Sequence, residues 1–235
     1  MNINKKILVF TATYNEVENI KSFVYSVKKQ PLDPDLLIID DNSPDKTADE
    51  IELLQKKFEN IILIKRSGKL GLDSAHKEAY DFAIKNDYDY LITMDADFSH
   101  DPNEIKNFVK NLEVYQFVIG SRYIEGGKCL MSGRRLFMSK FGNLIMKNFL
   151  QINCNEFTTS YRGFNLKRLK NFHLNLITTK GYSFFMGTIF EIFKKEFTVK
   201  EIPITFADRE KGYSKIPKLE IFRTLVNLLI LRFKK

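Results

Sequence analysis

Residues 90–102 read YLITMDADFSHDP, and the interpretation of the whole chain starts from this stretch. The apolar run Tyr90–Met94 is typical of a short buried strand, and Asp95 and Asp97 follow it directly. Two carboxylates spaced i, i+2 repel each other and are costly to leave unpaired when partly buried. Mg²⁺ and Mn²⁺ prefer oxygen ligands and commonly join one or two carboxylates to substrate phosphates. The stretch therefore favours a metal site at Asp95 and Asp97, although an isolated motif of this kind is more often a solvated loop that caps a helix.

Apolar runs and helical patterns alternate through the first half of the chain. Besides Tyr90–Met94, strand-like runs occupy Lys6–Thr13, Asp35–Asp40, Ile61–Ile64 and Phe117–Gly120. Helical patterns separate them at Glu16–Lys29, Asp45–Phe58, Leu72–Lys85 and from Pro102 onward. This alternation predicts an α/β fold with a mostly parallel sheet. Ligands of such sheets bind at the carboxyl ends of the strands, which directs attention to the residues that follow each run.

Polar residues follow the first two strands as well. At Tyr14-Asn15-Glu16, a purely structural interpretation makes Asn15 a helix N-cap, whereas a functional one stacks Tyr14 on a base. Segment 40–47 (DDNSPDKT) allows the same two interpretations. Asp45 or Thr47 would cap the next helix, and Asp40 and Asp41 could accept hydrogen bonds from a ribose or a base. The residues alone leave both alternatives open.

Three basic residues could neutralise a diphosphate together with a metal, namely Arg122, Arg209 and Lys215. Taken singly, such residues are more often solvated surface charges. The three histidines form no ligand cluster in the sequence, and neither a P-loop nor a Ser/His/Asp triad is recognisable.

The second half differs in pattern. Residues 134–150 suggest a basic amphipathic helix, and residues 218–235 a last helix with a wide apolar stripe and basic ends. Residues 198–206 (TVKEIPITF) favour an edge strand because of Pro203. Both helices resemble interfacial helices. Core packing is an equal alternative for the first helix, and membrane contact is favoured for the last.

The composition of the chain further restricts the class of protein to which it can belong. The chain has 235 residues and a net charge of +8, which suits one large domain with anionic partners. Its two cysteines, Cys129 and Cys154, exclude a disulfide-rich scaffold and a structural zinc site. The N-terminus lacks a signal-peptide pattern, and the apolar stretch Leu225–Phe233 is well short of the roughly 20 residues of a spanning helix. These features predict a cytoplasmic location.

In this order, the motifs resemble family 2 glycosyltransferases of GT-A fold, and most of all the dolichyl-phosphate or polyprenyl-phosphate mannose and glucose synthases. The resemblance runs from about Ile7 to Ile221. It rests on TATYNEVENI (11–20), IIDDNSPDKTA (38–48), KLGLDSAH (69–76), MDADFSHDP (94–102), GSRYIEGG (120–127), GYSFF (181–185) and EIPITFADREKGYSK (201–215). It implies a Rossmann-like GT-A domain over residues 1–215 and a C-terminal amphipathic interfacial helix over 216–235.

The resemblance also implies roles for individual residues. The nucleotide would be held by Ala12, Tyr14, Asn15 and Glu16, with Ile39 and Asp41 beside the base and ribose. The metal and diphosphate site would comprise Asp95, Ala96 and Asp97, with Ser99 as a further oxygen on the metal side. The diphosphate or acceptor phosphate would be contacted by Arg122, Arg209 and Lys215, which with Asp97 form the expected catalytic set.

Some positions depart from the family pattern. The usual Pro is Ala12, a usual Gly is Asp73, and the pattern D-x-T-S-G-F-R reads EFTTSYR over residues 156–162. The usual F-Q-x-E reads FFMG over residues 184–187, so Phe185 and Gly187 replace a Gln and a Glu. Those two side chains would lie toward the sugar or the acceptor, so the departure concerns substrate identity.

The resemblance implies a metal-dependent, inverting transfer of a hexose to a polyprenyl phosphate. Mannose or glucose is expected, from a GDP-mannose or UDP-glucose type of donor, with Mg²⁺ or Mn²⁺ as cofactor. The protein would associate peripherally with the cytoplasmic face of a membrane, with room for an anchoring partner protein. One alternative is sugar transfer to a hydroxyl of a cell-surface polysaccharide or a lipid-linked saccharide. A nucleic-acid-binding protein is suggested only by the net charge, and we expect no nucleic-acid partner.

Overall fold

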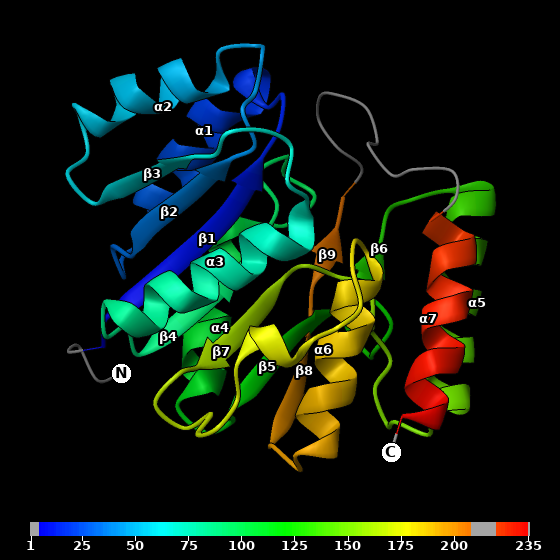
Figure 1. Cartoon of the computed structure of the whole chain (residues 1–235). Helices are drawn as coiled ribbons and strands as arrows, with labels where there is room; N and C mark the ends of the chain where they lie inside the picture. Colours follow the sequence, from blue (N-terminus) through cyan, green and yellow to red (C-terminus); the bar gives the residue numbers. More distant parts are fainter. Residues whose placement is uncertain (1–4, 208–219, 235) are drawn as a thin grey trace.

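The computed structural model describes residues 5–207 and 220–234. Seven strands form the main sheet in the order β3-β2-β1-β4-β7-β5-β8 (Figure 1). In chain order they are β1 (Ile7–Thr13), β2 (Asp35–Asp40), β3 (Ile61–Lys65), β4 (Tyr90–Thr93), β5 (Phe117–Ser121), β7 (Arg162–Asn165) and β8 (Val199–Pro203). Two short strands, β6 (Lys128–Cys129) and β9 (Thr205–Phe206), pair separately.

The sheet is mostly parallel, as the alternating pattern predicts. β7 is the exception, because it pairs antiparallel with both β4 and β5. The five strands expected in the first half are all present, and β8 lies at the edge of the sheet with Pro203 as its last residue. The local pattern did not indicate β7, whose sequence RGFN begins with a buried arginine.

Helices cover both faces of the sheet. They are α1 (Val17–Lys28), α2 (Thr47–Gln55), α3 (Leu72–Lys85), α4 (Ile105–Leu112), α5 (Gly133–Leu150), α6 (Ser183–Lys194) and α7 (Glu220–Phe233), with short 3₁₀ turns η1 (Pro102–Glu104) and η2 (Leu174–Leu176). The central strands are continuous apolar runs because both of their faces are buried. On β1, Leu8 and Phe10 join the core that includes α3 and α6, and Val9 joins the core that includes α1 and α4.

Helix α7 belongs to the folded body. It contacts α5 and α6, and its Leu228 and Leu231 are buried in the same core cluster as Met146 and Leu150 of α5. Figure 1 shows the α5–α7 pair beside α6, on the flank of the sheet that ends in β8. Within the described residues, no helix combines the length and apolar character needed to cross a bilayer.

Candidate active site

The two aspartates of the acidic motif lie just beyond β4 and are held by hydrogen bonds from serine side chains. Asp95 Oδ1 accepts from Ser160 Oγ at 2.7 Å. Asp97 Oδ1 accepts from the Ser99 amide at 3.1 Å and from Ser99 Oγ at 2.6 Å. Asp95 is partly exposed and Asp97 is buried. The capping role falls to Asp101, which accepts from the Asn103 amide at the start of η1.

The side chain of His100 forms a hydrogen bond with the backbone of this motif. Its Nδ1 accepts the Asp95 amide hydrogen bond at 3.1 Å, and its Nε2 lies 3.2 Å from Thr159 Oγ1. The ring is buried against Tyr161 and Phe206, and burial lowers the pKa of His100. A neutral imidazole is required here, because Nδ1 accepts the amide hydrogen bond. His100 is therefore a positioning residue for the acidic motif.

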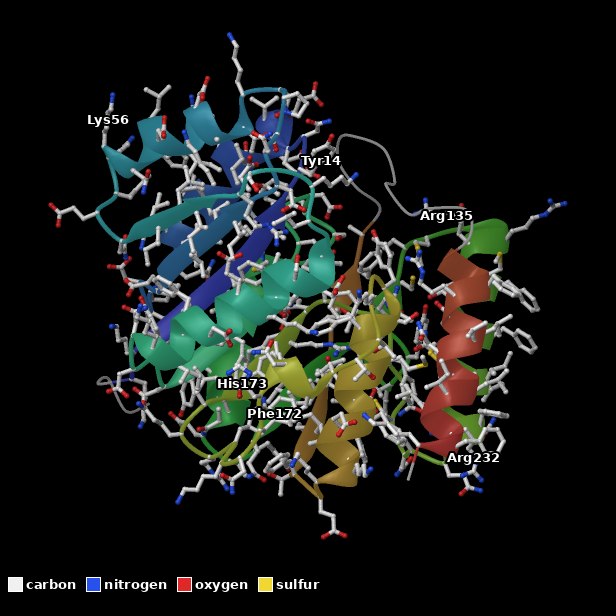
Figure 2. The ribbon with its side chains drawn as sticks, in the orientation of Figure 1. Tyr14, Lys56, Arg135, Phe172, His173 and Arg232 are labelled. Atoms are coloured by element: carbon white, nitrogen blue, oxygen red, sulfur yellow. The ribbon has the colours of Figure 1, made fainter. Side chains whose placement is uncertain are left out.

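The carboxyl ends of β1 and β2 lie next to each other in the sheet. Ala12 is in register with Ile39, and Thr13 is in register with Asp40. Tyr14 follows β1, half-buried, with Lys69 Nζ 4.1 Å from the centre of its ring. These positions bring the predicted nucleotide residues of both strands together, at the upper end of the sheet where Figure 2 labels Tyr14.

The loops that follow β1 and β2 are tied to each other by capping bonds. Asp45 accepts from the amide of Val17 at 3.1 Å and from the amide of Thr47 at 3.0 Å, so it binds the first amide of both α1 and α2. The expectation that Asp45 or Thr47 is the N-cap of the following helix is wrong: the N-cap position of α2 is Lys46, although Asp45 does accept a hydrogen bond from the first helical amide. The alternative that made Asn15 an N-cap is wrong: the N-cap position of α1 is Glu16, and Asn15 has a φ of 57°.

Asp41 is engaged by a residue that no motif singled out. The buried Arg66 forms an ion pair with Asp41 and donates to Gly71 O at 3.0 Å. Asp41 Oδ2 also accepts from the Gly71 amide at 3.2 Å. Asp41 thus joins the end of β2 to the segment before α3. The only signal for Arg66 was its place two residues after the third apolar run.

The structure places Arg122 in a buried ion pair. Its Nε donates to Glu156 Oε2 at 2.6 Å and its Nη2 donates to Glu156 Oε1 at 2.7 Å. Burial alone would raise the pKa of Glu156, but the charge and hydrogen bonds of Arg122, together with hydrogen bonds from Thr158, outweigh it and lower that pKa. Thr158 Oγ1 lies 2.7 Å from the same guanidinium. The predicted contact of Arg122 with a diphosphate stays a prediction, and Arg209 and Lys215 lie outside the described residues.

Gly187 stands where the family pattern has a Glu, and the side chain of Thr179 occupies the space beside it. A Cβ added to Gly187 would lie 2.2 Å from Thr179 Oγ1. Beside it, Phe185 contributes its ring to a cation–π contact with Arg162, at 4.8 Å, and its carbonyl accepts from Arg162 Nη1. Both departures of the FFMG segment are thus accommodated by packing within α6 and its neighbours.

The donor set at the acidic motif fits Mg²⁺ or Mn²⁺. Among the described residues, no three His, Cys, Asp or Glu side chains gather into a metal cluster. Mg²⁺ nevertheless is usually held by only one or two carboxylates together with substrate phosphates and waters. Asp95 and Asp97 supply two such hard oxygen donors at a strand end, with their orientation set by Ser160 and Ser99.

A mostly parallel sheet with one antiparallel inner strand matches the GT-A fold. The chain belongs to glycosyl transferase family 2, whose model matches residues 8–172. It is a glycosyltransferase of that family.

Two curated relatives are similar over nearly the whole chain. The polyprenol monophosphomannose synthase of Mycolicibacterium smegmatis is 33% identical over 217 residues, which cover 90% of this chain and 81% of the relative. The undecaprenyl-phosphate mannosyltransferase of Micrococcus luteus is 30% identical over 224 residues, which cover 95% and 92%.

Solved structures share the fold at lower identity. The glucosyl-3-phosphoglycerate synthase of Mycobacterium tuberculosis, in complex with Mn²⁺, UDP-glucose and phosphoglyceric acid, has a TM-score of 0.68 and 17% identity. The match covers 97% of this chain and 80% of that one. The same enzyme in complex with Mg²⁺ and UDP has a TM-score of 0.66 and 17% identity, over 97% and 79%.

Proposed function

We propose that this enzyme transfers a hexose from a nucleotide diphosphate sugar to a polyprenyl phosphate, with inversion at the anomeric carbon. The observation that carries the proposal is the acidic pair Asp95 and Asp97, oriented at the end of β4 beside the polar ends of β1 and β2. Both curated relatives are named for mannose transfer to a polyprenol or undecaprenyl phosphate. Mannose is therefore the preferred sugar, from a GDP-mannose type of donor, and glucose from a UDP-glucose type is the second choice.

In this proposal, Asp95 and Asp97 hold a divalent metal, which offsets negative charge on the leaving diphosphate. Tyr14 and Asp41 lie toward the base and ribose, with Asn15, Glu16, Ala12 and Ile39 around them. The family resemblance gives Arg209 and Lys215, outside the described residues, the role of binding the diphosphate. Two structures of the glucosyl-3-phosphoglycerate synthase support the cofactor assignment, since one holds Mn²⁺ with UDP and the other Mg²⁺ with UDP.

The acceptor needs little help from a protein base. A phosphomonoester with a second pKa near 6 is largely ionised at neutral pH, so its oxygen can attack the anomeric carbon directly. The buried histidines are poorly suited to proton transfer: burial, assisted by the charge of Arg162, lowers the pKa of His76 to about 3. A sugar hydroxyl would require a carboxylate base. The absence of a carboxylate at Gly187 thus favours a phosphate acceptor.

A transfer assay with labelled donors tests the proposal. The full chain is incubated with Mn²⁺, a polyprenyl phosphate and GDP-mannose or UDP-glucose, and lipid-linked product is extracted and identified. Asp97→Ala should reduce turnover by at least about 10²-fold, because it removes a metal ligand at the reacting diphosphate. Its circular dichroism spectrum should match that of the wild type.

Two results would count against the proposal. Turnover retained in Asp97→Ala would remove the metal assignment. If no lipid-phosphate sugar forms across a panel of donors, while sugar is transferred to hydroxyl acceptors, the alternative of a polysaccharide or saccharide acceptor would replace it.

We further propose that the enzyme works peripherally at the cytoplasmic face of a membrane, where its lipid acceptor lies, with an anchoring partner protein as an additional means of attachment.

A further inference from the structure

Two hydrogen bonds join α3 to the loop that precedes α6. Asp73 Oδ1, in the first turn of α3, accepts from the Gly181 amide at 3.0 Å. One turn further along α3, Lys77 Nζ donates to Ile177 O at 2.8 Å. Both bonds are partly buried and involve a charged side chain, and such bonds are stronger than those between neutral groups. Helix α3 thus holds both ends of residues 177–181, which we name the 177–181 loop.

The 177–181 loop is also fixed from the side of α6. Ile177 Cγ2 lies only 3.0 Å from the position that a Cβ on Gly187 would take. Gly181 has a φ of 61°, a left-handed conformation that glycine adopts without strain. The short turn η2, which precedes the loop, lies beside α3 (Figure 1). The position of the loop therefore depends on α3 on one side and on α6 on the other.

The start of α3 is tied to the nucleotide side of the site as well. The Gly71 amide donates to Asp41 Oδ2 at 3.2 Å. Arg66, which pairs with Asp41, donates from Nη1 to Ser74 Oγ at 2.6 Å. Asp41 is the residue expected beside the base and ribose. The start of α3 therefore connects the end of β2 with the 177–181 loop, and Asp73 is the residue of its first turn that reaches the loop.

Asp73 and the FFMG segment both depart from the family pattern. The usual Gly at position 73 has no side chain with which to accept the Gly181 amide. Phe185 and Gly187 replace a Gln and a Glu that would lie toward the sugar or the acceptor. The chain thus lacks two polar groups on the acceptor side, and it has one additional carboxylate bound to the loop that leads there. A carboxylate that already accepts an amide hydrogen bond is suited to hold this loop in place.

We propose that Asp73 is a positioning residue for the acceptor side of the site. By binding the Gly181 amide, it holds the 177–181 loop and the start of α6 in the arrangement that receives the acceptor. A loop that is already ordered costs less free energy to bind against, so loss of Asp73 should weaken acceptor binding. The role in acceptor binding rests on the proposed function, whereas the hydrogen bond does not.

Hydrogen exchange of the full chain, measured by NMR at the Gly181 amide, tests the contact itself. Asp73→Gly installs the residue of the family pattern and should accelerate this exchange by roughly tenfold or more, because the acceptor of the hydrogen bond is gone. Asp73→Asn should retain most of the protection, since its amide oxygen can accept the same bond. Unchanged exchange in Asp73→Gly would overturn the proposal, and so would equal acceleration in both variants.

Steady-state kinetics tests the positioning role. In Asp73→Gly the KM for polyprenyl phosphate should rise roughly tenfold, the loss expected for one hydrogen bond to a charged group. The dissociation constant of the nucleotide sugar with Mn²⁺ should stay within about twofold of the wild type, because only the acceptor side is released. Asp73→Asn should restore an acceptor KM close to that of the wild type. An unchanged acceptor KM in Asp73→Gly, or an equal loss of donor binding, would contradict the proposal.

Asp49→Gly is the matched control. Asp49 is likewise an acidic residue in the first turn of a helix, in this case α2, and it is exposed. The variant reproduces the cost of a glycine in a first turn without touching the 177–181 loop. Both the exchange of the Gly181 amide and the acceptor KM should equal those of the wild type. If the control matched Asp73→Gly in these two measurements, the helix rather than the contact would be responsible, and the proposal would fall.

Failure of the proposed function can be told apart from failure of this inference. If the wild type transfers sugar to a saccharide hydroxyl and not to polyprenyl phosphate, the proposed acceptor is wrong. A roughly tenfold higher KM of Asp73→Gly for that hydroxyl acceptor would still support the positioning role. If the wild type does use polyprenyl phosphate while exchange and KM ignore Asp73→Gly, the proposed function stands and the positioning role is excluded.

Discussion

At the scale of single residues, the candidate active site consists of polar groups that are already oriented by neighbours. Ser160 holds Asp95, Ser99 holds Asp97, and Arg66 holds Asp41. Oriented groups of this kind lower the cost of binding because little ordering remains to be done when the ligand arrives. Arg122 differs from these residues, because the carboxylate of Glu156 already binds its guanidinium.

The pair formed by Arg122 and Glu156 yields a stability prediction. Glu156→Leu should lower the free energy of unfolding by about 3–5 kcal/mol, because it leaves a buried guanidinium without its carboxylate. Arg122→Met combined with Glu156→Leu should recover most of that loss, since no buried charge remains. Urea unfolding of the three proteins measures both values. An additive double variant would mean that the ion pair is not the source of the loss.

The same double variant addresses catalysis. If Arg122 contacts the diphosphate, as its motif predicts, the folded double variant should show a clearly lower kcat in the transfer assay. Full activity would mean that Arg122 only stabilises the loop that carries Glu156 and Thr158 and does not contact the diphosphate.

His76 yields a prediction about pH. It is buried among the rings of Phe10, Phe184 and Phe185, and its pKa is lowered to about 3. The ordinary pKa of about 6.5 applies to the unfolded chain, so only the unfolded state binds this proton between these two values. The stability contributed by neutral His76 is therefore complete above pH 6.5 and is lost as the pH falls toward 3. Between pH 7 and pH 5 the free energy of unfolding should drop by about 2 kcal/mol from this residue.

Urea unfolding at the two pH values, compared between wild type and His76→Phe, measures that contribution. The variant should lose less stability on acidification than the wild type. Some loss should persist, because burial also lowers the pKa of His100. An identical drop in both proteins would exclude His76 as a cause.

At the scale of elements, α6 shows how a departure from the family pattern is accommodated. Gly187 brings α6 close to the segment before it, where Ile177 and Thr179 pack on the bare Cα. Thr179 Oγ1 is buried and has no hydrogen-bond partner within the described residues. A glutamate at position 187 could not coexist with this arrangement, so the change at 187 and the position of Thr179 are coupled.

A double-mutant cycle tests this coupling. Gly187→Ala should destabilise the protein by about 1–3 kcal/mol, because the added Cβ would overlap Thr179 Oγ1. In a Thr179→Ala background the same change should cost much less, since that oxygen is gone. Gly142→Ala in α5 is the control: nothing lies within 4 Å of its added Cβ, so it should stabilise by about 0.5–1 kcal/mol. Equal costs of Gly187→Ala in both backgrounds, measured by thermal unfolding, would exclude the contact.

At the scale of the whole molecule, α7 is attached to the core although it comes last in the chain. Ending the chain after Pro217 removes Leu228 and Leu231 from the core they share with α5. Burial of each leucine is worth about 1.5–3 kcal/mol, so the truncated protein should melt roughly 10 °C lower. Circular dichroism melting measures the shift, and an unchanged Tm would show that α7 is a dispensable appendage. Vesicle binding should also fall more than donor binding.

The strand pattern and the acidic motif were predictable because their signals are local. A strand buried on both faces must be an apolar run, and the residue after it must lie at the sheet edge, so Asp95, Asp97 and Tyr14 could be placed from spacing alone. β7 was not predictable in this way. Its four residues include a buried arginine that is satisfied by carbonyls of Thr159, Phe157 and Phe185, and only the folded chain brings these together.

The amino-acid sequence by itself therefore determined the α/β architecture, the family and the location of the acidic pair, because each rests on periodicity and motifs within short windows. The tertiary structure alone decided which charges face one another. Arg122 meets Glu156 across 34 positions of sequence, and Arg66 meets Asp41 across 25. It also decided that α5 and α7 turn apolar side chains outward as well as inward. An apolar stripe in a sequence does not show which of its side chains face the core. The elements that pack against the helix in the folded chain determine which apolar side chains are buried and which stay exposed.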